Sequence, residues 1–168
     1  MKSFGIMCNL KQEQKMSDFM KVVYGLTHTD LEIVWGSALP TASQKGYPKI
    51  FDSASYWVLY DGDTVVAYTT HLKIEGVVLV GNTYIRKEYR SKGLHTYLLS
   101  QRNNSAALKG FTKITVLNPI EDSQLKNLIK VVSKLGYEKV EKIGDISPNI
   151  SDELFIQLTE SGKQVWRC

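Results

Sequence analysis

Cysteine is scarce in this chain of 168 residues, which contains only Cys8 and Cys168. Two cysteines at opposite ends match neither the spacing of a metal site nor the dense pattern of a disulfide framework. We therefore expect two free thiols in a reducing compartment, which indicates the cytoplasm, and no bound metal.

Long apolar runs are missing as well. No stretch approaches the roughly 20 apolar residues that cross a bilayer, and the first residues lack the basic-then-apolar layout of a secretory signal. We expect no membrane partner.

Neither sign of charge is in large excess, because the chain has 21 basic and 17 acidic residues, for a net charge of +4. That balance permits an anionic ligand or nucleic acid and requires neither.

Internal repeats and low-complexity tracts are also absent, and a hydrophobic content of 43% is enough for one core. We expect a single domain over residues 1–168. In its first part, the patterns predict a strand at 4–10, a helix at 13–24, a short helix at 31–35 and an irregular loop at 36–55.

Strands are predicted next, at 56–60, 64–73 and 77–85, because the glycine turns between them are typical of hairpins. A helix over 92–108 then precedes a strand at 111–117. Since a helix separates that strand from the previous one, the two are expected to be parallel.

The last part predicts a helix that starts at Asp122 or Ser123, strands at 137–143 and 154–158, and a tail at 165–167 that forms an edge strand or hangs free. The whole order predicts an α/β (α+β) fold. Its mixed, mostly antiparallel sheet should have six to seven strands, flanked by about four helices.

One segment, 84–95, combines the end of a strand, a basic turn with a glycine and the start of a helix. This geometry directs backbone N–H groups and a helix N-terminus at an anion. A diphosphate is the ligand that it favours.

The turn resembles the acyl-CoA-binding motif of the GCN5-related N-acetyltransferase (GNAT) superfamily, Arg/Gln-x-x-Gly-x-Gly/Ala. Here it reads Arg90-Ser91-Lys92-Gly93-Leu94-His95, and Asn118 with Gly136-Tyr137 matches the family's second half. The resemblance covers about 56–143. It implies a GNAT-like fold whose fourth and fifth strands part to admit pantetheine. It also implies an N-acyltransferase, most simply an acetyltransferase, that uses acetyl-CoA or another acyl-CoA in a ternary complex.

The resemblance further implies an amine acceptor, either a small molecule or a peptide, and leaves a homodimer open. The first helices and their loop should cover the acceptor, with a minority of the aromatic residues there lining its pocket. By the motif, the cofactor-binding residues would be Ile85, Arg90, Ser91, Lys92, Gly93, Leu94, His95, Thr96 and Asn118.

Two positions depart from the family pattern. His95 stands where the family has Gly or Ala, and Val132 stands where many members have a Tyr that protonates the leaving thiolate. A water, Ser133 or no residue at all would then protonate coenzyme A. The catalytic candidates are Asn82, Tyr84 and His95, and His71 and Glu75 are weaker candidates for a base.

Two other functions are compatible with the sequence. The basic turn and the altered His95 would suit a GNAT-fold protein that modifies nucleic acid or nucleobases, like the Mom-like proteins of bacteriophages. Without an evident acid or base, the chain would also suit a catalytically silent binding protein.

Overall fold

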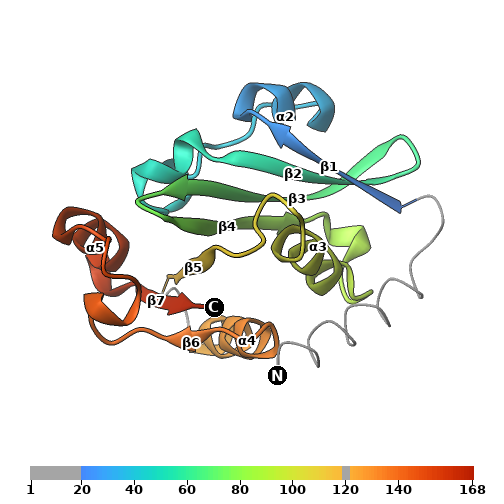
Figure 1. Ribbon diagram of the computed structural model, residues 1–168. Coiled ribbons are helices and arrows are strands. Elements are labelled where there is room, and N and C mark those ends of the chain that lie inside the picture. The colour runs from blue at the N-terminus through green and yellow to red at the C-terminus, as the bar shows by residue number, and fades with distance from the viewer. Residues whose placement is uncertain (1–19, 119–121) are drawn as a thin grey trace.

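The computed structural model describes residues 20–118 and 122–168; for residues 122 and 123 it describes the backbone alone. One seven-stranded sheet runs through it in the order β1-β2-β3-β4-β5-β7-β6 (Figure 1). Only the β4–β5 pair is parallel. The predicted fold class, a mixed and mostly antiparallel sheet with helices on it, is confirmed. The strands are β1 Met20–Leu26, β2 Ser55–Asp61, β3 Thr64–Ile74, β4 Val77–Ile85, β5 Thr112–Leu117, β6 Glu138–Lys139 and β7 Gln164–Arg167.

Four α-helices lie in the described ranges: α2 His28–Trp35, α3 Leu94–Asn103, α4 Asp122–Lys134 and α5 Asp152–Thr159. Alternate residues of β4 identify the faces that they cover. Val78 and Val80 pack in the cluster that holds residues of α3 and α4, whereas Val77 and Leu79 pack in the cluster that holds residues of α5. Because side chains alternate across a strand, α3 and α4 cover one face and α5 covers the other.

The three-strand meander and the parallel β4–β5 pair follow the sequence prediction closely. At the other end, the predicted helix 13–24 is wrong for its last residues. Met20–Leu26 form strand β1, since the edge of β2 satisfies their backbone groups, from Met20 opposite Asp61 to Leu26 opposite Tyr56. The strand predicted at 4–10, with Cys8, and the helix before residue 20 lie outside the described residues.

The predicted strand 154–158 is also wrong, because these residues belong to α5. The Ser151 hydroxyl caps that helix by accepting from the Leu154 N–H at 3.1 Å. Leu154 and Leu158, four residues apart, are buried, while Ile156 between them is 59% exposed. This spacing is helical.

Three smaller differences separate the observed elements from the predicted ones. The tail forms β7, an interior strand between β5 and β6. The predicted strand 137–143 contracts to Glu138–Lys139, and the helix predicted over 92–108 ends at Asn103.

The parallel pair parts halfway along β4. Pairing with β5 runs only from Val77–Thr112 to Val80–Thr115. Beyond it, Tyr68 pairs with Tyr84 and Thr70 with Gly81, so β4 holds one more residue than β3 there. Asn82, in this bulge, has φ of +50°. A bulge bends its strand, and β4 accordingly turns away from β5, as the split expected from the family resemblance requires.

Candidate functional site

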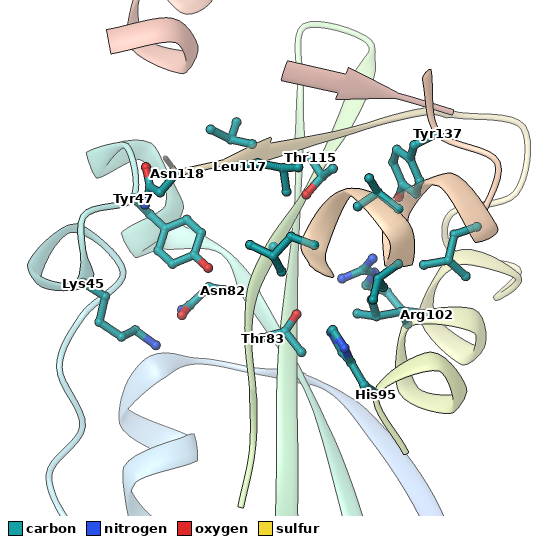
Figure 2. A pocket seen from close by; sticks show the side chains of 17 residues that line it. Lys45, Tyr47, Asn82, Thr83, His95, Arg102, Thr115, Leu117, Asn118 and Tyr137 are labelled. Carbon is teal, nitrogen blue, oxygen red and sulfur yellow. The ribbon is translucent and has the colours of Figure 1, made fainter. Parts of the chain in front are cut away.

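A cavity of about 310 Å³ lies where β4 and β5 part. Residues of both strands, of α3 and α4, and of the loop before β2 line it. Figure 2 shows Lys45, Tyr47 and Asn82 on one side of the opening, and His95 and Arg102 on the other. The cavity thus lies between the loop that precedes β2 and the face of α3 that carries His95, Leu99 and Arg102.

The turn before α3 has the backbone of an anion-binding loop. Ser91 and Gly93 both adopt left-handed conformations, with φ of +63° and +79°, and Gly93 caps the helix without a side-chain hydrogen bond. The first N–H groups of a helix have no partner within it. They are therefore directed at whatever lies before α3, while the buried Leu94 anchors the first turn in the core.

The basic side chains of this turn lie on the surface. Arg90 donates from Nε to the Ile85 carbonyl oxygen at 2.9 Å, and its guanidinium lies 5.2 Å from the centre of the Tyr84 ring. The Lys92 ammonium lies 5.4 Å from the Tyr89 ring. These contacts hold both cations beside the turn, although neither lines the cavity.

His95 is the one predicted turn residue whose side chain lines the cavity. Burial lowers the pKa of its imidazole, and the nearby Arg102 guanidinium lowers that pKa further. The ring is therefore neutral at pH 7, so it adds bulk and hydrogen-bonding capacity to this end of the cavity without adding charge.

Asn82 also lines the cavity and is 1% exposed. Its Nδ2 donates to the Tyr56 hydroxyl oxygen at 3.2 Å, and its Oδ1 has no hydrogen-bond partner among the described residues. Buried acceptors are normally satisfied. The Asn82 carbonyl oxygen is thus suited to accept a hydrogen bond from an N–H of a bound molecule.

The other base candidates lie elsewhere. Tyr84 is 41% exposed and packs against Trp35 and Tyr68 outside the cavity. His71 accepts from the Trp57 indole N–H at 2.7 Å. Glu75 accepts from the backbone N–H of the residue that caps α5, at 3.2 Å. The last two contacts are structural.

Lys45 is a cavity residue that the sequence did not single out. Its Nζ donates to the Tyr68 hydroxyl at 2.8 Å and lies 4.9 Å from the centre of that ring. Burial lowers the pKa of the ammonium to about 8. A lysine with such a pKa exchanges its proton near neutral pH, as a general base must. Nothing in the polar loop sequence distinguishes Lys45 from the exposed Lys49.

Arg102 was missed as well. It lies on the same stripe of α3 as His95 and Leu99, at i, i+4 and i+7, and all three line the cavity. An arginine on a stripe that is otherwise buried was the available signal.

The hydroxyl groups that line the cavity do not include the one that the sequence suggested as a proton donor to coenzyme A. Val132 lines the cavity, and Ser133 is exposed and outside it. Tyr137, which directly follows Gly136, brings a buried hydroxyl that accepts from Asn103 Nδ2 at 3.1 Å. Burial raises the pKa of this phenol, so it stays protonated.

Asn118 connects the end of β5 to the loop that precedes β2. It lines the cavity and donates from Nδ2 to the Gly46 carbonyl oxygen at 3.4 Å.

Within residues 20–118 and 122–168, no three His, Cys, Asp or Glu side chains form a group that could hold a metal ion. None of the helices in these ranges has the length and apolar character needed to cross a membrane.

No protein-family model matches the sequence, and no curated protein matches it either. Solved structures do. A Klebsiella pneumoniae subsp. pneumoniae protein assigned as an acyl-CoA N-acyltransferase superposes with a TM-score of 0.59 at 12% identity, covering 90% of this chain and 97% of that one. An acyl-CoA N-acyltransferase from Pseudomonas aeruginosa gives a TM-score of 0.53 at 13% identity, over 88% and 98% of the two chains. The chain has the GNAT fold.

The same GNAT fold is seen in Arabidopsis thaliana Naa50, solved in complex with the bisubstrate analogue CoA-Ac-MVNAL. Its TM-score is 0.51 at 15% identity, over 89% of this chain and 98% of that one. At sequence identities this low, the structural match establishes the fold alone. The activity of this GNAT-fold chain is therefore argued from its own cavity and turn.

Proposed function

We propose that the chain is an acyl-CoA-dependent N-acyltransferase, most simply an acetyltransferase, acting on an amine. The observation that carries this proposal is the cavity at the β4–β5 split. It has the start of α3 on one side, and a lysine of lowered pKa and an unpaired Asn82 carbonyl oxygen on the other. The proposed reaction needs an anion site for the diphosphate, then a channel for the pantetheine arm, and a base at the far end of that channel.

The cofactor would be held by backbone rather than by charge. The N–H groups from Ser91 to Thr96 would wrap the diphosphate of acetyl-CoA, where the dipole of α3 adds to the attraction. Ile85 and Asn118, at the ends of β4 and β5, would offer groups to the pantetheine arm. No metal takes part in this scheme.

Transfer would proceed by direct attack. The neutral amine nitrogen attacks the thioester carbonyl carbon, the C–N bond forms, and the C–S bond breaks with its electron pair leaving on sulfur. Lys45 takes the proton that the amine gives up, and the thiolate gains one to leave as coenzyme A. The protonated Tyr137 hydroxyl is the available donor on the cofactor side of the cavity.

The acceptor would enter on the side of Lys45. Asn82 Oδ1 would accept a hydrogen bond from the amine and orient its lone pair. Tyr84, exposed beside Trp35, would contact more distant parts of the acceptor. A small-molecule or peptide amine fits this arrangement, in the cytoplasm as expected from the cysteine content.

One cation of the basic segment, Arg86, is not available for nucleic acid. Arg86 donates from Nε to the Val65 carbonyl oxygen at 2.6 Å and from Nη2 to the Trp35 carbonyl oxygen at 3.1 Å. Its guanidinium also covers the Trp35 ring at 3.8 Å. This cation holds the end of β4 in place and is not displayed for phosphate contacts.

Acetyl-CoA at millimolar concentration is expected to raise the melting temperature, because a ligand that binds only the folded state stabilises it. Coenzyme A release should then follow in a screen of small amines and peptides. No shift with acetyl-CoA would contradict the proposal, and a salt-sensitive shift with duplex DNA instead would favour nucleic-acid modification. A shift without thiol release across the screen would favour the silent binding protein.

His95→Ala is expected to bind acetyl-CoA more tightly, by roughly tenfold, because the ring fills space that smaller residues leave open in the family motif. Since the pKa of His95 is lowered, the gain should be the same at pH 7 and pH 8. Isothermal titration calorimetry at both pH values measures it. Weaker binding by the variant would instead show that the imidazole contacts the cofactor.

A further inference from the structure

Arg102 is a buried cation for which the described residues provide no counter-ion. It is 2% exposed. The only ion pairs within the described ranges are His28–Glu32 and Lys139–Glu141. A buried charge is costly unless it is paired. A guanidinium in this position therefore calls for an anion from outside these residues.

The partners that Arg102 does have are all neutral. Nη1 donates to the Thr69 hydroxyl oxygen at 2.6 Å, and Nε donates to Asn103 Oδ1 at 3.0 Å. The Tyr137 phenol lies close by, and burial keeps it protonated. These contacts fix the direction of the guanidinium without neutralising its charge.

The guanidinium also lines the cavity, where Figure 2 shows it on the side of His95. Arg102 follows His95 by seven residues, so its Cα lies about 10 Å further along the axis of α3. Its side chain extends back toward the start of the helix, and the guanidinium lies near enough to His95 to lower the pKa of that imidazole. Residues 90–94 do not line the cavity, whereas Arg102 does, so the guanidinium offers an anion site inside the cavity, apart from the N–H groups of the turn.

We propose that Arg102 binds a carboxylate of the molecule that occupies the cavity. A planar guanidinium fork matches a carboxylate in geometry. If the proposed acyltransferase function holds, that carboxylate is carried either by the acyl group, as in a coenzyme A thioester of a dicarboxylic acid, or by the amine acceptor. Arg102 lies on α3 with the cofactor turn, and this favours the acyl group.

The first arm of the test compares acyl donors of matched length. Succinyl-CoA carries a terminal carboxylate, and butyryl-CoA has the same four-carbon chain without it. Calorimetry on the full chain is expected to give about tenfold tighter binding of succinyl-CoA, as one charge-assisted hydrogen-bonded pair would provide. Arg102→Met should abolish this preference, and Arg102→Lys should retain part of it.

The second arm compares acceptors, with acetyl-CoA as donor. Coenzyme A release is measured with amino acids and with the amines that remain when their carboxyl group is removed. A preference for the amino acids that Arg102→Met abolishes would assign the carboxylate to the acceptor. Equal behaviour of wild type and Arg102→Met in both arms would overturn the proposal.

Free glutarate separates this proposal from the acyltransferase function. Even if no coenzyme A ester binds, glutarate should raise the melting temperature of the wild type and leave that of Arg102→Met unchanged. If glutarate shifts the melting temperature of neither protein, the proposal is overturned. The variant should fold, since Thr69 keeps its contacts with the Thr83 hydroxyl at 2.7 Å and the Gly81 carbonyl oxygen at 3.3 Å. Without ligand, it should melt at or above the wild-type temperature, because an unpaired buried charge is gone. A purely structural arginine would give the opposite result.

Discussion

Lys45→Met is expected to reduce acyl transfer at pH 8 by about 10²- to 10⁴-fold, the usual contribution of a general base. Burial lowers the pKa of Lys45 to about 8, so this side chain is neutral in half of the molecules at that pH. The ammonium cannot accept a proton. Wild-type activity should therefore fall about tenfold for each pH unit below 7 and level off above 9.

Lys49→Met is the matched control, because Lys49 belongs to the same loop, is exposed and does not line the cavity. It should keep the wild-type rate and pH profile. The profile of Lys45→Met should lose the rise with a midpoint near pH 8. If that rise persists in the variant, it belongs to the acceptor amine, and Lys45 is not the base.

Gly93→Val is expected to weaken acetyl-CoA binding by about 10- to 150-fold, which corresponds to losing hydrogen bonds to a charged diphosphate. Gly93 has φ of +79° at the start of α3, a conformation that a β-branched residue avoids. Valine would shift the turn and add a side chain where the backbone should approach the phosphates. Calorimetry with acetyl-CoA measures the loss.

Gly110→Val separates strain from binding. Gly110 has a similar φ of +83°, open space around the Cβ position and no part in the cavity. Both variants should lose about 1–3 kcal/mol of unfolding free energy through backbone strain, measured by urea denaturation. Only Gly93→Val should lose cofactor affinity. An equal loss of affinity in both would remove the diphosphate from this turn.

Lys45 and Arg102 together define the chemistry proposed for the cavity. One is a lysine that burial brings close to neutrality, and the other is an arginine that burial leaves charged and without a carboxylate partner among the described residues. The difference follows from their intrinsic basicity, since a guanidinium keeps its proton where an ammonium gives it up. The proposed reaction therefore uses Lys45 as the base and Arg102 as the anion site beside α3.

Local sequence determined much of this architecture. The β2–β3–β4 meander, the helix after Gly93 and the parallel β5 could be predicted because hairpin turns, caps and a crossover depend on residues close in the chain. The strand–turn–helix geometry around Gly93 could be predicted for the same reason, since a strand end, a glycine and a helix start are contiguous in it.

Only the tertiary structure decided the rest. Met20–Leu26 became a strand and not a helix because the free edge of β2 pairs with it. β7 became an interior strand because it pairs with β5 on one side and with β6 on the other. Lys45 gained its lowered pKa from burial in the folded chain, where it donates to Tyr68, 23 residues away. Burial and pairing of this kind are set by packing between distant segments, so the sequence alone specifies the turn that would hold the cofactor and the packed fold specifies the groups proposed to react beside it.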